Sequence, residues 1–70
     1  MATEFDTGLP SVRQVQAFIR DQNTLEIKLL TGDVFTGGIV WQDAHTICLS
    51  AEGETILAMR AAVAYIKIVN

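Results

Sequence analysis

The sequence predicts a mainly β protein, in which an N-terminal α-helix precedes a strongly bent antiparallel sheet of five strands that can close into a small barrel. Three observations predict this fold. The apolar spacing changes at Leu25 from a helical period to an alternating one. The later apolar segments are joined by a few residues each, which requires antiparallel neighbours. The longest of them contains Gly37-Gly38, which permit a sharp bend or bulge.

The N-terminal part of the chain carries the helical pattern. Residues 1–8 are polar and unpatterned, so we expect a flexible arm followed by one domain over residues 9–70. A helix is predicted over residues 11–22, with Ser11 as N-cap and Gln14 where a capping box needs Glu or Gln. One face of this helix is apolar: Val12, Val15, Phe18 and Ile19.

Alternation of apolar and polar residues predicts strands after the helix. Leu25 to Leu29 alternates as a strand with one buried face does. Gly32 can adopt the positive φ of a tight turn, and Gly53 lies in a second turn between two glutamates. The predicted strands are residues 25–31, 34–43, 45–51, 55–60 and 63–69.

The size of the chain indicates how it is stabilised. With 70 residues it holds one domain, and a chain of this size buries roughly 60% of its unfolded surface. Its one cysteine, Cys48, cannot form an intrachain disulfide, and one histidine with one cysteine cannot make a structural zinc site. Oligomerisation remains the ordinary source of added stability.

Charge and motifs restrict the function. The net charge is −3, and an acidic chain begins at a disadvantage in binding phosphates. The sequence contains no long apolar run, signal peptide, nucleophile motif, phosphate loop or metal-ligand spacing. We therefore expect a cytoplasmic binding module with no membrane contact, catalytic residue, metal or cofactor, and not an enzyme; the lone thiol also fits a reducing compartment.

A set of short motifs resembles a known family. Leu29 to Asp33, then Gly37, Ile39 and Trp41 to Asp43, follow the first signature of Sm-type proteins. The chain resembles Hfq, the bacterial branch of the Sm/LSm family, from about Leu9 to Ile68. Two segments look like its cyanobacterial form, Phe5 to Gln14 and Ala62 to Ile66. The resemblance implies an Sm-like, SH3-like barrel, with Gly32, Gly37 and Asp43 as its structural signature.

The resemblance also implies a homohexameric ring. In the family, the fourth strand of one subunit pairs with the fifth strand of the next. The side chains expected at this interface are Ile56, Leu57, Met59, Tyr65 and Ile66. Two exposed apolar edges would invite such pairing; the alternative is that the two strands pair within one monomer.

The family binds uridine-rich RNA around the pore of the ring, on the face that carries the helices. The base-stacking position falls on His45, and the Tyr/Phe-Lys-His triplet falls on Met59-Arg60-Ala61. Arg60 keeps the cation and His45 offers a π-face, whereas Ala61 replaces the histidine. The alternatives are an ordinary turn histidine and a solvated arginine.

Two further RNA surfaces of the family are changed in this sequence. On the opposite face, which binds adenine-rich RNA, the stacking Tyr position is Lys28, and Gly32 and Asp33 form the nearby turn. Lys28 can neutralise a phosphate but gives no equivalent platform, and Asp33 repels one. The Arg-rich rim is reduced to Arg20, beside Asp21, and a pairing of Arg20 with water or with Asp21 is expected.

Two functions follow from these replacements. The first is an RNA-associated regulatory ring with weak or altered binding of uridine-rich RNA. The alternative is a ring that docks a protein with little direct RNA role. For cyanobacterial relatives, the resemblance implies the type IV pilus extension ATPase as such a partner, in motility and DNA uptake.

Overall fold

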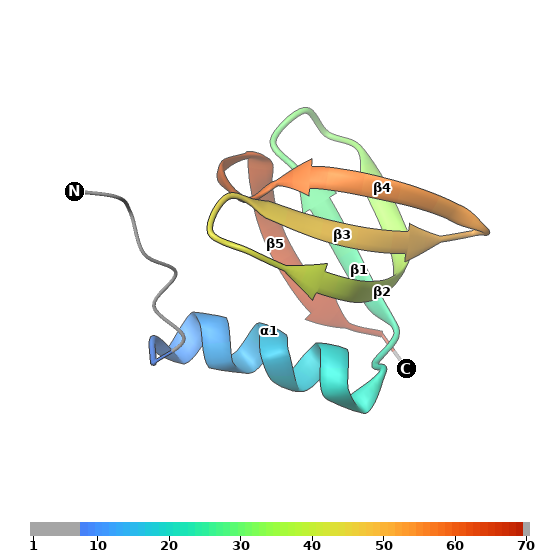
Figure 1. Ribbon diagram of the computed structural model, residues 1–70. Helices are drawn as coiled ribbons and strands as arrows, with labels where there is room; N and C mark the ends of the chain where they lie inside the picture. The colour runs from blue at the N-terminus through green and yellow to red at the C-terminus, as the bar shows by residue number, and fades with distance from the viewer. Residues whose placement is uncertain (1–7, 70) are drawn as a thin grey trace.

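The computed structural model describes residues 8–69 and gives one helix and five strands within that range (Figure 1). The flexible arm predicted over residues 1–8 lies outside the described residues, apart from Gly8. The elements are α1 (Pro10–Asp21), β1 (Leu25–Leu29), β2 (Val34–Gln42), β3 (Thr46–Ala51), β4 (Glu54–Met59) and β5 (Val63–Ile68), with a 3₁₀ turn (Arg60–Ala62) between the last two strands. Helix and strands thus occur where the periodicity predicts them, and the boundaries differ by one or two residues.

The prediction of Ser11 as N-cap is wrong. Helix α1 begins at Pro10, Leu9 is its N-cap, and no side chain among the described residues caps it. Proline suits the first helical position because its φ is already helical and it has no N–H to satisfy. Ser11 therefore lies inside the first turn. At the other end Gln22 adopts φ 54°, and the N–H groups of Gln22 and Asn23 bond back to helix carbonyls.

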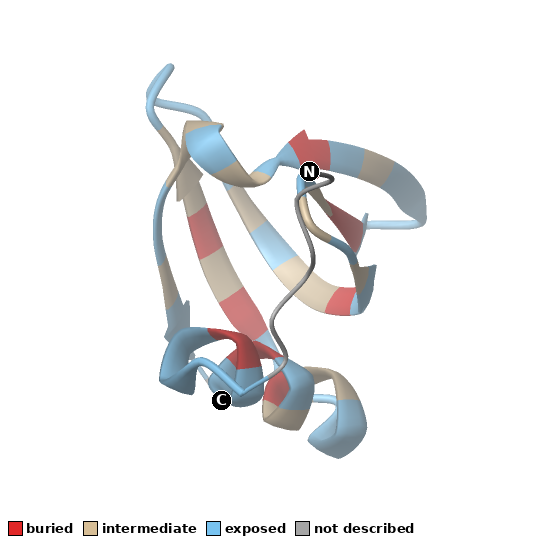
Figure 2. Cartoon of the chain, turned by 60° about the vertical axis from the view of Figure 1, so that its left-hand side comes forward, coloured by how far each residue is buried: buried red, intermediate tan, exposed pale blue. Residues whose placement is uncertain are grey.

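The helix packs its predicted apolar face against the sheet. Val12, Val15 and Phe18 are buried, and Ile19 is partly buried against the same cluster. Leu25 and Ile27 of β1 are almost inaccessible to solvent and belong to that cluster too. In Figure 2 the buried positions of α1 and β1 lie next to each other. The core thus sits between the helix and the concave side of the sheet.

The sheet bends where β2 changes its partner. Residues 34–37 of β2 pair with β1, and from Gly38 onward β2 pairs with β3. A Cβ on Gly37 would collide with the Ser50 carbonyl oxygen and lie 2.9 Å from the Ala51 Cα atom. Only glycine allows this close approach of two strands. In Figure 1 the resulting two halves cross, with β3 and β4 in front of β1 and β5.

The outer strands of the sheet are β4 and β5. The strand order is β4-β3-β2-β1-β5, with all neighbours antiparallel. Within residues 8–69, β4 and β5 do not pair with each other, which contradicts the alternative of intrachain pairing. Leu57 and Met59 on β4 are 57% and 51% exposed. A single chain therefore ends in two edges that present both backbone groups and apolar side chains.

Candidate nucleic-acid interface

The residues predicted to line a pore come together at the ends of β2 and β4. The Arg60 N–H donates to the His45 carbonyl oxygen at 2.8 Å, and Met59 is the register partner of Thr46. His45 and Met59 are exposed and Arg60 is half-buried. The three residues are therefore neighbours along the backbone of the fold. Their side chains, an imidazole, a thioether and a guanidinium, are of types that suit contact with a base and a phosphate.

Asp43 holds the turn that presents His45. Its Oδ1 accepts hydrogen bonds from the backbone N–H groups of His45, at 3.0 Å, and Thr46, at 2.8 Å. The Asp43 N–H donates to the Thr46 carbonyl oxygen at 2.9 Å. Aspartate stabilises turns in this way because its short side chain reaches backbone groups two and three residues ahead. The carboxylate therefore serves the turn between β2 and β3.

Gln42 positions Arg60. The Arg60 Nη1 donates to the Gln42 Oε1 at 2.6 Å. The Gln42 Nε2 donates in turn to the Val12 carbonyl oxygen at 3.2 Å and to the Gln16 Oε1 at 2.8 Å. The guanidinium is thereby connected to the helix, and a neutral amide orients it without cancelling its positive charge.

Sequence reasoning missed this role of Gln42. Its partners Val12 and Gln16 are 30 and 26 positions away, so no local spacing could indicate the contact. The only available signal was a polar side chain at the last position of a strand, directly before the turn that carries His45.

The residues predicted on the opposite face lie at the end of β1 and in the following turn. Lys28 pairs across the sheet with Val34 on one side and Tyr65 on the other. Gly32 has φ 98°, which suits glycine in a tight turn. Thr31 Oγ1 donates to Asp33 Oδ2 at 2.6 Å, so the exposed carboxylate stays beside this turn.

A cross-strand cluster, also missed by sequence reasoning, joins β1 and β5. The Tyr65 hydroxyl donates to Glu26 Oε2 at 2.5 Å, and Lys67 Nζ lies 3.6 Å from the same oxygen. The hydrogen bond from Tyr65 lowers the pKa of Glu26, with further lowering from the charges of Lys67 and Lys28. The same bond raises the pKa of Tyr65.

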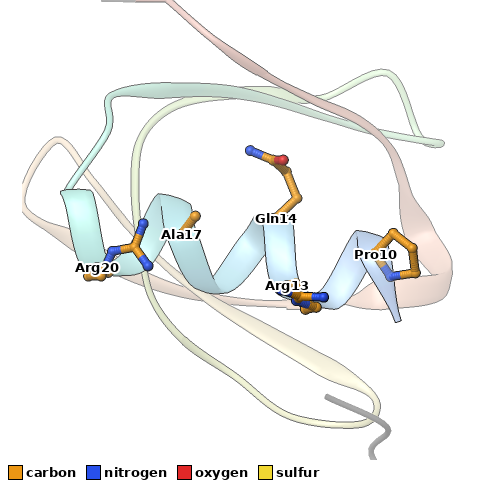
Figure 3. Close-up of a pocket in the computed structure, with 5 residues that line it drawn as sticks. All are labelled: Pro10, Arg13, Gln14, Ala17 and Arg20. Atoms are coloured by element: carbon orange, nitrogen blue, oxygen red, sulfur yellow. The ribbon is translucent and has the colours of Figure 1, made fainter. Parts of the chain in front are cut away.

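The rim position is occupied by an exposed ion pair. Arg20 Nε donates to Asp21 Oδ1 at 3.0 Å, and Nη2 to Oδ2 at 3.3 Å. The hydrogen bond raises the pKa of Arg20 and lowers that of Asp21. Arg20 also borders a shallow hollow along the outer side of α1 (Figure 3), whose lining residues are Pro10, Arg13, Gln14, Ala17 and Arg20. Because the Asp21 carboxylate already binds the Arg20 guanidinium, Arg20 has less positive charge and fewer N–H donors left for a phosphate.

The residues predicted at the subunit interface differ in orientation. Ile56 and Ile66 pack against the core of their own chain. Leu57, Met59 and Tyr65 are exposed on the edge strands. Any contact across these edges would therefore use the second group of side chains together with the strand backbones.

No helix within the described range is both long and apolar enough to cross a membrane.

The chain is similar to one protein family and to solved structures of Hfq proteins. Residues 9–68 match the profile of a family described as Hfq related. The crystal structure of an Hfq protein from Anabaena sp. has a TM-score of 0.80 and 39% sequence identity, covering 89% of this chain and 100% of that one. A crystal structure of the pleiotropic translational regulator Hfq has the same TM-score at 19% identity, covering 83% and 97%, and supports the fold alone. No match was found among curated proteins.

Proposed function

The chain belongs to the Hfq-related family, and from that premise we propose that it forms a homohexameric ring that binds uridine-rich RNA weakly at its pore. The family consists of non-enzymatic, Sm-like RNA-binding chaperones that typically form homohexamers. Its fold supports a role as an RNA-associated regulator. The ring of this chain and the strength and site of its RNA contact are the parts proposed.

The strand order carries the proposal. β4 and β5 lie at opposite ends of the sheet, and each presents an edge with exposed apolar side chains. Pairing β4 of one copy with β5 of the next would satisfy both edges. Because the two edges differ, the contact is head-to-tail, and such contacts close into a ring when the rotation per subunit allows it.

The pore site lies next to this contact. Arg60 belongs to the short turn between β4 and β5, and its backbone is bonded to His45. Pairing of these strands between copies would bring the His45–Met59–Arg60 groups of neighbouring subunits near one another. Repetition of one cation around a ring focuses a positive field that a single subunit cannot produce.

Charge limits the affinity of that site. Each copy carries a net charge of −3, so assembly also gathers carboxylates that repel phosphates. The side chain of Ala61 offers no hydrogen-bond donor where the family has a histidine. Weak binding that depends on Arg60 and strengthens at low salt is the physical expectation.

A mass measurement and a titration test the proposal. Light scattering is expected to give six times the 7.7 kDa of one chain. Labelled oligo-U is then titrated at two salt concentrations onto the unmodified ring, Arg60→Ala, and Arg13→Ala. Arg13 is an exposed cation on the outer side of α1, so its loss measures the general effect of removing one charge per subunit.

The outcomes separate the two functions. Loss of oligo-U binding in Arg60→Ala, with a smaller effect of Arg13→Ala, supports the pore site. Equal effects of both substitutions would reject it. A ring that binds no oligonucleotide at either salt concentration would instead favour the alternative, a ring that docks a protein such as a pilus extension ATPase. A single-chain mass would contradict the ring itself.

A further inference from the structure

We propose that Gln16 of α1 is a positioning residue for the pore arginine, because it fixes which end of the Gln42 side-chain amide faces Arg60. The inference deepens the proposed binding of RNA at the pore and rests on it. Gln16 would act through Gln42 and Arg60, without touching RNA itself. The affinity of the pore for RNA would then depend on a side chain of the helix.

The amide of Gln42 has two chemically different ends, and each end faces a different kind of partner. Its Oε1 accepts a hydrogen bond from Arg60 Nη1 at 2.6 Å. Its Nε2 donates to the Val12 carbonyl oxygen at 3.2 Å and to Gln16 Oε1 at 2.8 Å. An amide nitrogen carries two N–H groups, so the helix accepts both of them and leaves the amide oxygen for the guanidinium.

Reversal of the Gln42 amide would release Arg60. The NH₂ group of the amide would then face a guanidinium, which contains donors only. The amide oxygen would face the carbonyl oxygen of Val12, which is an acceptor only. Neither pair can form a hydrogen bond. The orientation of one amide therefore decides whether the cation beside the pore is held in place.

Gln16 is the exchangeable part of this arrangement. Val12 contributes a backbone carbonyl, which stays the same whatever side chain occupies that position. Gln16 lies one helical turn later on the same face of α1 and contributes a side chain. It is exposed, so a substitution there does not disturb the buried apolar face of the helix. The helix thus offers the Gln42 amide one fixed acceptor and one that mutation can change.

Substitutions that add charge at position 16 separate positioning from general electrostatics. Lysine has donors only, so Gln16→Lys removes the acceptor that holds Gln42 Nε2 while it adds a positive charge. General electrostatics predicts that an added cation tightens RNA binding, whereas the positioning role predicts that binding weakens. Gln14→Lys is the matched control, because it adds the same charge on the outer side of α1 (Figure 3), away from Gln42.

Titration of labelled oligo-U onto these variants measures the difference. We expect Gln16→Lys to bind about threefold more weakly than the unmodified chain, because the loss of one hydrogen bond has an effect of this order. Gln14→Lys should bind more tightly than the unmodified chain. Glutamate keeps an acceptor, so Gln16→Glu should bind at least as tightly as Gln14→Glu, which carries the same added charge. Equal effects of Gln16→Lys and Gln14→Lys would overturn the proposal.

Nuclear magnetic resonance tests the positioning without RNA. In the unmodified chain, the Arg60 guanidinium should rotate slowly and give separate signals for its two Nη groups, because the bond to Gln42 restrains its rotation. We expect these signals to merge in Gln16→Lys and to stay separate in Gln14→Lys. Thermal unfolding of the two variants should match, since both positions are exposed. Separate Arg60 signals in both variants would contradict the positioning role.

The two measurements together distinguish failure of this inference from failure of the pore site. If Arg60→Ala leaves oligo-U binding unchanged while Gln16→Lys merges the Arg60 signals, the pore site fails and the hold of Gln16 on the Arg60 geometry stands. If Arg60→Ala abolishes oligo-U binding while Gln16→Lys and Gln14→Lys have the same effect, only this inference fails.

Discussion

The bend of β2 packs against another strand of the same chain, whereas the two edge strands, β4 and β5, each have a strand neighbour on one side only within residues 8–69. At the bend, the chain supplies both sides of the contact, with Gly37 against the backbone of Ser50 and Ala51. At the edges, β4 and β5 each pair on one side, and exposed Leu57 and Met59 line β4. One chain therefore supplies both sides of the contact at the bend, whereas β4 and β5 each leave one side unpaired within the described residues, and the proposed ring would place a second copy there.

Gly37→Ala tests the bend and should have the largest effect. The added methyl group meets backbone atoms, which cannot rotate away, so we expect a loss of about 3 kcal/mol in the free energy of unfolding. Chemical denaturation measures it. Gly38→Ala is the matched control, because its Cβ would meet the Asn23 carbonyl oxygen at an ordinary 3.7 Å. Equal stability of the two variants would show that the bend tolerates a side chain.

Leu57→Glu tests the edge. A carboxylate on β4 should oppose pairing with another chain and leave the core intact, so we expect at least a tenfold rise in the concentration needed for assembly. Sedimentation at several concentrations measures this. Val40→Glu is the control, since Val40 is similarly exposed, at 53%, but lies on an inner strand. Loss of circular-dichroism signal in Leu57→Glu would mean that the substitution damages the fold instead.

Gln42→Ala tests the connection between the core and the edge. It removes the bonds that join Arg60 to the helix, and we expect a loss of about 1 kcal/mol in the free energy of unfolding. Oligo-U binding should also weaken, because Arg60 loses its orientation. Thermal unfolding and anisotropy measure the two effects. Gln14→Ala, at an exposed helix position, should change neither; weaker RNA binding in both variants would argue against a specific role for Gln42.

The pH dependence of stability tests the side-chain hydrogen bond from Tyr65 on β5 to Glu26 on β1, and this effect should be the smallest. The pKa of Glu26 is lowered in the fold, so its contribution is present above the ordinary carboxyl value of 4.5 and is lost as the pH falls through the folded value. The pKa of Tyr65 is raised, so its contribution is present below 10.0 and is lost as the pH rises through the folded value.

Tyr65→Phe removes that bond and provides the measurement. The stability difference between Tyr65→Phe and the unmodified chain should be greatest near neutral pH and shrink toward both extremes. Thermal unfolding across the pH range follows it. A difference that does not vary with pH would mean that the contribution of the Tyr65 hydroxyl is not coupled to the ionisation of Glu26.

Local pattern determined most of the fold. The change of period at Leu25, the turn at Gly32 and the glycines in β2 are enough to predict a helix followed by antiparallel strands with a bend, because spacing along the chain reports which face of an element is buried. The motifs also indicated the family, and the grouping of His45, Met59 and Arg60 followed from it. The predicted N-cap, Ser11, was wrong because the helix begins at Pro10, whose fixed φ favours the first helical position, and this effect outweighs capping by the Ser11 side chain.

The tertiary structure alone decided which distant side chains meet. Gln42 reaches Val12 and Gln16 across the core, and Tyr65 stands opposite Lys28. These contacts depend on the packing of the helix and on strand register, and a slip of one residue would turn every side chain of a strand to the other face. Periodicity determines which residues are inside, but it carries no information about which neighbours they find there. For that reason the sequence by itself could predict the scaffold, while the support of Arg60 by Gln42 and the contact of Tyr65 with Glu26 emerged only from the folded chain.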